Sequence, residues 1–226
     1  MRLVCVADTH TFTAELAVPD GDVLVHAGDI GRAGTFEELE AAAAWLRSLP
    51  HRHKVVVAGN HDWLFVHDPP RARALFADTF YLEDDEVVID GIRFYGSPWQ
   101  PEFNEWAFNL PRGPALARVW SKIPRGVDVL ITHGPPHGIG DRGGYGPDRA
   151  GCEELLARVA EVAPRVHMFG HIHQDGGAWQ RGTTLFANVT TWECTRAPTV
   201  IDIDPRRVTA VEVPPSGRRD DDDQTW

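Results

Sequence analysis

Five short apolar runs, each ending in polar residues, constrain the fold of this chain more than any other feature. The polar clusters at their ends are Asp8-x-His10, Gly28-Asp29, Gly59-Asn60-His61, His133-Gly134 and Gly170-His171-x-His173. Helix-like segments alternate with apolar runs, which is typical of a parallel sheet with helices on its faces. Ligands of such sheets bind outside the carboxyl ends of the strands. We therefore expect the five clusters to meet at one edge of the fold.

Capping and turn signals predict the other elements. Residues 35–50 predict a helix because Thr35 and Glu38 have capping-box spacing and Pro50 ends the pattern. A second, amphipathic helix is expected over residues 151–164, and Asp90-Gly91 predicts a hairpin within residues 86–96. Strands are expected over residues 183–190, 198–204 and 208–213. Residues 97–114 contain too many prolines and aromatic side chains for a regular element and predict an ordered loop.

Length and composition bound the class of protein. A chain of 226 residues can form one substantial core, so we expect one domain over residues 1–213 and a flexible acidic tail over residues 214–226. No apolar run approaches the roughly 18 residues that span a bilayer. The first apolar run is too short for a secretory signal, so a cytoplasmic protein is expected. Cys5, Cys152 and Cys194 are widely spaced and are predicted to be buried, unpaired thiols.

The net charge restricts the partners. At −11 it argues against extended contact with nucleic acid or with anionic membranes. A small anionic substrate remains compatible with a locally positive site. No sequence feature predicts an oligomeric state.

The polar clusters together contain two carboxylates, several imidazoles and one carboxamide, with no thiolate. This oxygen and nitrogen set suits Mn, Fe, Zn or a similar divalent ion, and it is too large for one ion. Two ions sharing a carboxylate would hold both the attacking and the leaving oxygen of a phosphoryl displacement. Taken singly, Asp8 or Asp29 is typical of a turn or a helix cap, and only the joint occurrence favours a metal site. His26 and His167 are predicted to be core residues, and His51, His53 and His67 to be exposed.

In their order along the chain, the motifs D-x-H, GD, GNHD, TH-G-P-P and GHIH resemble those of the calcineurin-like metallophosphoesterases. The resemblance covers roughly residues 1–205. The stretches GSPWQPEFNEWAFNLPRG, HGPPHGIGD, GCEELL and FGHIH are similar to the branch of metallophosphoesterase-domain-containing proteins, which is related to class III cyclic-nucleotide phosphodiesterases. The resemblance implies a four-layer α/β/β/α sandwich.

The resemblance also implies roles for individual residues. One ion would be held by Asp8, His10, Asp29 and His173, and the other by Asp29, Asn60, His133 and His171. A hydroxide bridging the ions would attack phosphorus, and His61 would protonate the leaving oxygen. The family pattern often has another acidic residue shortly after GD, whereas this chain has Arg32 in that vicinity.

The substrate is the least constrained prediction. The branch resemblance favours small, nucleotide-like phosphodiesters; the alternatives are a phosphomonoesterase acting on a small metabolite or nucleotide, and a non-catalytic scaffold stabilised by metal. The presence of His61 and His171 counts against the scaffold. Candidate substrate contacts are His137 and Arg142 after the fourth run, and Trp99, Phe103 and Trp106, on which a nucleobase would stack. The alternative for His137 and Arg142 is that their side chains are solvated, and the alternative for the three aromatic residues is that they pack within the loop.

Overall fold

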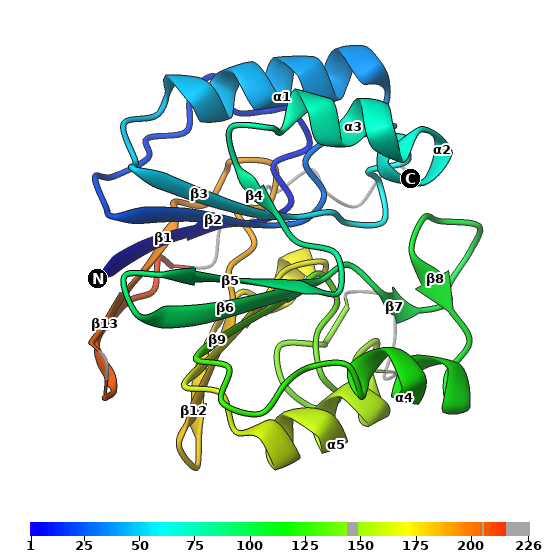
Figure 1. Ribbon diagram of the computed structural model, residues 1–226, viewed down its shortest axis with the longest axis vertical. Coiled ribbons are helices and arrows are strands. Elements are labelled where there is room, and N and C mark those ends of the chain that lie inside the picture. Colours follow the sequence, from blue (N-terminus) through cyan, green and yellow to red (C-terminus); the bar gives the residue numbers. More distant parts are fainter. Residues whose placement is uncertain (144–148, 205, 216–226) are drawn as a thin grey trace.

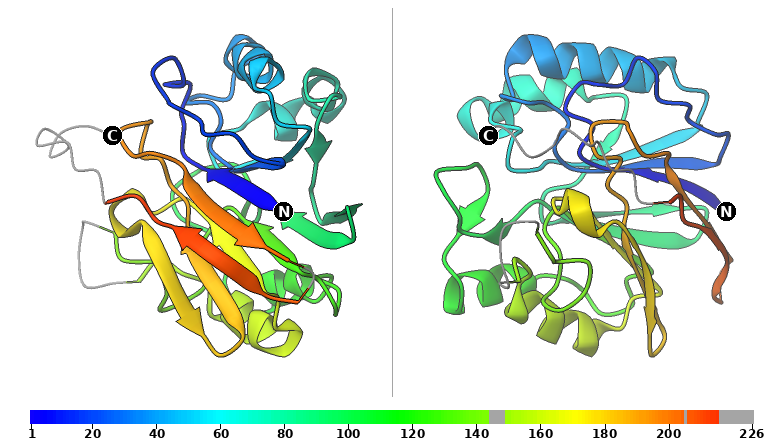
Figure 2. Two further views of the ribbon diagram at one scale, coloured as in Figure 1. Left: turned by 90° about the vertical axis from the view of Figure 1, so that its left-hand side faces the viewer. Right: turned by 180° about the vertical axis from the view of Figure 1, so that it is seen from behind.

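Two six-stranded sheets lie face to face at the centre of the structure, and helices cover both outer faces (Figure 1). The structure is a computed structural model that describes residues 1–143, 149–204 and 206–215. The further views keep α1 (Phe36–Ser48) and α3 (Pro69–Leu75) on one outer side and α5 (Glu153–Val162) on the other (Figure 2). The layer order is α/β/β/α, which confirms the predicted four-layer sandwich.

The first sheet has the strand order β14-β13-β1-β2-β3-β4. Its parallel strands are β1 (Arg2–Val6), β2 (Val23–Ala27), β3 (His53–Val57) and β4 (Phe80–Tyr81). The strands β13 (Thr199–Ile203) and β14 (Val208–Glu212) extend it in antiparallel pairing. Because β1, β2 and β3 are parallel neighbours, the three chain segments that follow them emerge at the same edge.

The second sheet has the order β11-β12-β10-β9-β6-β5. Its inner strands, β12 (Thr184–Asn188), β10 (Val166–Phe169), β9 (Val129–Thr132) and β6 (Ile92–Ser97), are parallel. The outer strands β11 (Gly177–Arg181) and β5 (Asp85–Ile89) pair antiparallel with their neighbours. The hairpin between β5 and β6 turns at Asp90-Gly91, where φ is 47° and 81°, and this confirms the predicted turn.

Three apolar clusters hold the layers together. The central one, which includes Val25, Phe94 and Ile131, lies between the two sheets. The outer clusters lie under α1, α2 (Leu64–His67) and α3, and under α4 (Pro114–Trp120) and α5. Because both faces of each sheet are covered, the central strands have nearly continuous apolar sequences. The helix α1 begins with the predicted capping box, in which Thr35 and Glu38 each accept from the other's backbone N–H.

Two sequence predictions were wrong. The first concerned residues 97–114, where β7 (Gln100–Pro101) and β8 (Asn109–Leu110) form a small parallel pair and α4 begins at Pro114. Strands of two residues show no periodicity, so the pattern missed them. The second concerned His51 and His53. His51 is only 3% exposed, and its Nε2 donates to the carbonyl of Pro19 at 3.0 Å, while His53 is half-buried.

Other expectations have different outcomes. His26 and His167 are buried and each is hydrogen-bonded to a threonine hydroxyl, as expected of core residues. The three cysteines are unpaired, although Cys194 is only partly buried. None of the helices in the described ranges is long and apolar enough to cross a bilayer. Within the predicted tail, residues 216–226 lie outside the described residues, so the tail stays a prediction.

Candidate metal centre

The predicted ligands gather where the parallel strands of the two sheets end. Asp8 and His10 follow β1, Asp29 follows β2, Asn60 and His61 follow β3, His133 follows β9, and His171 and His173 follow β10. Ligand atoms lie within 4.8 Å of one another in the groups Asp8/His10/His173, His10/Asp29/His61 and Asp29/His133/His171. Since His10 and Asp29 each belong to two groups, the three groups form one continuous cluster.

The distances within the cluster suit divalent ions. His133 Nε2 lies 2.9 Å from Asn60 Oδ1 and 3.3 Å from Asp29 Oδ2. His10 Nε2 lies 3.8 Å from Asp29 Oδ2, and His173 Nε2 lies 3.7 Å from Asp8 Oδ1. Ligand bonds of about 2.1 Å place atoms around one ion about 3.0 to 4.2 Å apart. The donor types and their spacing therefore fit a metal site, with Asp29 shared between two groups.

Backbone carbonyls orient three of the imidazoles. The Nδ1 atoms of His10, His61 and His133 lie 3.1, 2.5 and 3.0 Å from the carbonyl oxygens of Gly31, Arg32 and Ala27, respectively. Because a carbonyl can only accept, each Nδ1 carries the hydrogen and each Nε2 is the nitrogen available for a ligand or a proton. Metal-binding histidines commonly have such a partner, which fixes both tautomer and ring orientation.

The backbone is strained at four predicted ligands. Asp8, His10, Asp29 and His171 have φ values of 54°, 44°, 54° and 70°, in the left-handed region that residues other than glycine seldom adopt. Hydrogen bonds hold part of this geometry, since the N–H of His10 donates to the carbonyl of Asp29 at 3.2 Å. Strained residues that cluster in this way are typical of functional sites, where the surrounding structure compensates for their cost.

A glycine makes room for the shared carboxylate. A Cβ atom at Gly59 would lie 2.2 Å from Asp29 Oδ1 and 2.3 Å from the backbone nitrogen of Asp29. Both separations are far inside van der Waals contact, and the second involves backbone that cannot move aside cheaply. The glycine before Asn60 therefore allows the loops after β2 and β3 to approach each other.

Asp62 is a supporting residue to which the sequence analysis gave no role. Its buried carboxylate accepts from the backbone N–H groups of Ile30, Gly31 and Gly59 at 2.7 to 3.2 Å. It therefore joins the loop after Asp29 to the loop before Asn60. Its place as the last residue of the quoted motif GNHD was the only available signal. Burial and the neighbouring Asp29 raise the pKa of Asp62 to about 7, against the lowering effect of the three N–H groups.

Burial and neighbouring charges shift the pKa values of the carboxylates and imidazoles in the cluster in different directions. Burial tends to raise the pKa values of Asp8 and Asp29, but neighbouring imidazoles outweigh it and hold both below their usual range. Burial tends to lower the pKa of His133, but Asp29 outweighs it and raises that pKa to about 9. Burial and then His133 lower the pKa of His171 to about 3. Without a metal ion, the two carboxylates are thus ionised at neutral pH and His133 supplies part of the compensating positive charge.

The aromatic candidates divide between site and core. The ring of Trp106 packs against His61 at a centroid distance of 4.1 Å, and the ring of Phe103 lies 5.1 Å from that of His171. Trp99 packs against Phe108 instead, and its Nε1 donates to Asp84 at 3.2 Å. The structure therefore brings Phe103 and Trp106 to the metal cluster and places Trp99 in the packing beneath the loop.

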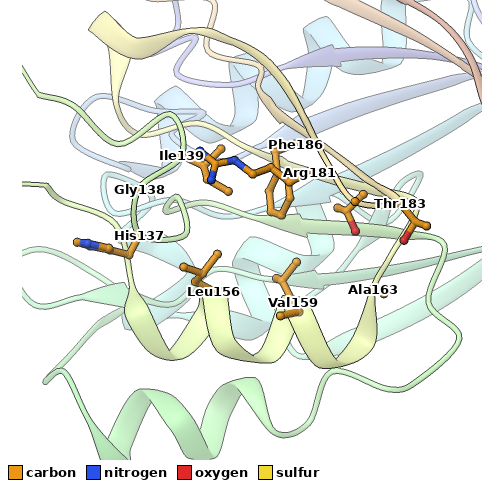
Figure 3. Close-up of a pocket in the computed structure, with 12 residues that line it drawn as sticks. His137, Gly138, Ile139, Leu156, Val159, Ala163, Arg181, Thr183 and Phe186 are labelled. Atoms are coloured by element: carbon orange, nitrogen blue, oxygen red, sulfur yellow. The ribbon is translucent and has the colours of Figure 1, made fainter.

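The two other candidate substrate contacts, His137 and Arg142, make their contacts with residues other than the predicted metal ligands. His137 lines a cavity of about 460 Å³ formed mainly by α5, β11 and β12, whose lining residues include no predicted metal ligand (Figure 3). Its Nδ1 is 4.0 Å from a carboxylate oxygen of Asp141. The backbone N–H of Arg142 donates to Asp175 at 2.9 Å, in the short 3₁₀ helix His173–Asp175. The loop carrying both residues is thus fastened close to His173.

The fold and the donor set define an α/β sandwich protein with a metal-binding cluster at the strand ends. The calcineurin-like phosphoesterase superfamily domain matches residues 1–199 of this chain. The chain belongs to that family, as the motifs predicted, and so to a group of metal-dependent phosphoester hydrolases.

Individual relatives agree with this assignment. Human metallophosphoesterase domain-containing protein 1 is 42% identical over 230 residues, covering 89% of this chain and 71% of that protein. The UPF0046 protein K07C11.7 of Caenorhabditis elegans is 39% identical over 202 residues, covering 83% and 69%. The crystal structure of TT1561 of Thermus thermophilus has a TM-score of 0.64 at 14% identity, covering 94% and 98%. The last similarity concerns the fold alone.

Proposed function

We propose that this protein hydrolyses small, nucleotide-like phosphodiesters with the help of two divalent metal ions. The observation that carries the proposal is the continuous cluster in which Asp29 belongs to two ligand groups, one of which also contains His10 and His61. A shared carboxylate is the arrangement that places two ions close enough to act on one phosphoryl group. The family relationship supports phosphoester hydrolysis in general, and the branch resemblance supports the choice of diesters.

The ligand assignment follows the two halves of the cluster. We assign Asp8, His10, Asp29 and His173 to one ion and Asp29, Asn60, His133 and His171 to the other, and the donor types suit Mn, Fe or Zn. When bound, such ions would activate a water molecule and neutralise charge on the phosphoryl oxygens. The protein's part is to present two ionised carboxylates and to hold the Nε2 atoms of His10 and His133 toward them.

His61 is proposed as the proton donor to the leaving oxygen. Its Nδ1 hydrogen is held by the carbonyl of Arg32, so Nε2 is the nitrogen that can carry the transferable proton. This contact uses the backbone of Arg32, whose guanidinium lies 5.3 Å from the ring centre of Phe12. The backbone carbonyl of residue 32 therefore orients His61, a contact that does not depend on which side chain stands at that position.

The first experiment compares diester with monoester hydrolysis. Protein stripped of metal and reloaded with Mn²⁺ is assayed on bis(p-nitrophenyl) phosphate and on p-nitrophenyl phosphate. Faster turnover of the diester is expected. Preference for the monoester would replace the proposal with a phosphomonoesterase, and silence on both substrates with two ions bound would favour the scaffold.

A second experiment tests His61 through the leaving group. The p-nitrophenolate anion is stable near neutral pH and needs little protonation, whereas an alkoxide needs a proton donor. His61→Ala should therefore reduce turnover of alkyl diesters much more than turnover of p-nitrophenyl diesters, with both ions retained. His67→Ala, which removes an exposed histidine on α2, is the control. If His61→Ala reduced turnover of both classes of diester equally, or if an ion were lost, His61 would be assigned to metal binding.

The proposed location is the cytoplasm. The observation that supports it is the presence of three unpaired cysteines, which suit a reducing compartment better than an oxidising one. Fractionation of cells expressing the full chain tests this, and recovery in a secreted or membrane fraction would contradict it.

A further inference from the structure

Two aromatic side chains from the stretch that follows β6 of the second sheet lie against histidines of the predicted metal-binding cluster. Phe103 and Trp106, here called the aromatic rim, belong to the stretch between β6 and α4. Trp106 packs on His61 with a centroid distance of 4.1 Å and an interplanar angle of 35°, and Phe103 meets His171 at 5.1 Å and 62°. Figure 1 shows β7 and β8 on the side of the molecule where the parallel strands end.

The stretch that carries the rim is held by other groups. Trp99 donates to Asp84, and Phe108 is only 6% exposed at the centre of the packing beneath. The side-chain amide of Asn109 donates to the carbonyls of Phe103 and Asn104 at 2.9 and 3.2 Å, which fixes the tip of the loop between β7 and β8. The hydrogen bonds of the tip come from Asn109, so the ring of Phe103 is not needed to hold its shape.

The rim is also tied directly to a predicted ligand. The N–H of Ala107, next to Trp106, donates to the backbone carbonyl of Asn60 at 3.1 Å. This bond joins the stretch after β6 to the motif that follows β3 in the other sheet. The indole is thereby placed beside His61 by backbone contacts, a preorganised position that costs little when a ligand binds.

The side chain of Phe103 is 38% exposed although it lies beside polar metal ligands. An apolar ring at this place contributes nothing to ion binding, but it can contact an apolar part of a substrate. A group attached to the oxygen that His61 protonates must lie near Trp106, because the two rings are in contact. Planar rings gain from stacking on an indole beyond the area they bury.

We propose that the aromatic rim makes this site selective for phosphate esters whose leaving group carries a planar ring, with Trp106 as the main specificity-determining residue. The inference rests on the proposed function, since it uses His61 as the donor to the leaving oxygen. Phe103 adds a second apolar contact on the side of His171.

The test uses two diesters that differ only in planarity. When the P–O bond to the larger group breaks, benzyl methyl phosphate and cyclohexylmethyl methyl phosphate release primary alcohols with the same number of carbons, and these alcohols are the products measured. The ratio of their kcat/KM values is measured with metal-loaded protein. We expect Trp106→Ala to lower the benzyl preference by about 3- to 10-fold, and Trp106→Phe to keep most of it. Phe80→Ala, which removes a similarly exposed ring (39%) on β4, is the matched control and should leave the ratio unchanged.

The intrinsic reactivities of the two esters cancel when variant and parent ratios are compared. An equal loss on both esters in Trp106→Ala would overturn the inference and make Trp106 a positioning residue for His61. Binding provides a readout that needs no turnover: the metal-loaded protein is titrated with benzylphosphonate and with cyclohexylmethylphosphonate. We expect the parent protein to bind the benzyl compound more tightly and Trp106→Ala to lose this preference. Equal affinities of the parent protein for both compounds would refute the selectivity proposed for the aromatic rim. A preserved binding preference with no hydrolysis of any ester would refute the proposed function alone.

Discussion

Replacing Asp62 by asparagine tests how the two loops of the cluster are joined. One carboxylate oxygen accepts from Ile30 and Gly31 at 3.0 and 2.9 Å, and the other accepts from Gly59 at 2.7 Å. An amide has one acceptor oxygen, so its NH₂ group must face at least one of these N–H donors. Leaving one buried donor unsatisfied costs about 1 to 3 kcal/mol.

The same substitution should loosen the metal site. Asp62 touches neither ion in the proposed assignment, but it holds the backbone next to Asp29 and Asn60. Changes to such supporting partners typically weaken metal binding about 10- to 100-fold. We expect Asp62→Asn to lose affinity for the ion assigned to Asn60 and His133 in particular.

The assay has two parts and a matched control. Urea unfolding of the stripped protein gives the stability change at a pH above about 7, where the Asp62 carboxylate is ionised, and titration with Mn²⁺ gives the affinities. Asp141→Asn is the control. Asp141 is also fully buried, and one of its oxygens accepts from the backbone N–H groups of Gly138 and Gly151 while the other accepts from the guanidinium of Arg149, but it lies outside the cluster. It should lose stability while keeping its ions. Equal weakening of metal binding by both variants, or unchanged stability of Asp62→Asn, would refute the reasoning.

Three other perturbations test the shared ligand, the protonation of the cluster and a helix cap. Asp29→Ala should lose both ions, whereas His173→Ala should weaken mainly one; equal retention in a metal analysis would show that Asp29 is not shared. Because the pKa of His133 is raised from 6.5 to about 9, ion binding must displace its proton, so metal affinity should increase with pH up to about 9. The raised pKa of His133 also stabilises the metal-free fold below about pH 6.5, a contribution lost as the pH rises through about 9. Calorimetry in buffers of different ionisation heat measures the released protons, and pH-independent affinity would contradict the assignment. Thr35→Ala removes a helix cap and should cost about 1 kcal/mol in thermal or urea unfolding without changing activity.

The candidate metal ligands could be predicted from the sequence because they lie at strand ends. Asp8, Asp29, Asn60 and His133 each follow an apolar run, and parallel pairing brings such positions to one edge whatever the loop lengths. Asp62 received no role, since its three donors belong to backbone groups up to 32 residues away and a backbone N–H leaves no trace in a sequence.

The aromatic stretch shows the limit of sequence reasoning. Trp99, Phe103 and Trp106 are equivalent in type and lie within a few residues of each other. Only the tertiary structure distinguishes them, because Trp99 donates a hydrogen bond to the carboxylate of Asp84 while Trp106 packs against the ring of His61. Both partners lie in other connecting segments, at least 15 residues away in sequence, so no local pattern could have distinguished the two indoles.

The sequence by itself determined the strand ends and the chemical types of the ligands, because hydrophobic periodicity and short motifs are local properties of the chain. The four-layer architecture was implied by the family resemblance that those motifs carry. The tertiary structure decided which way the imidazoles of His10, His61 and His133 face and which aromatic rings border the cluster. These depend on contacts between the two sheets, such as His133 Nδ1 with the carbonyl of Ala27, 106 residues away. Packing of segments far apart in sequence creates such contacts, and it turns a set of candidate ligands into a site.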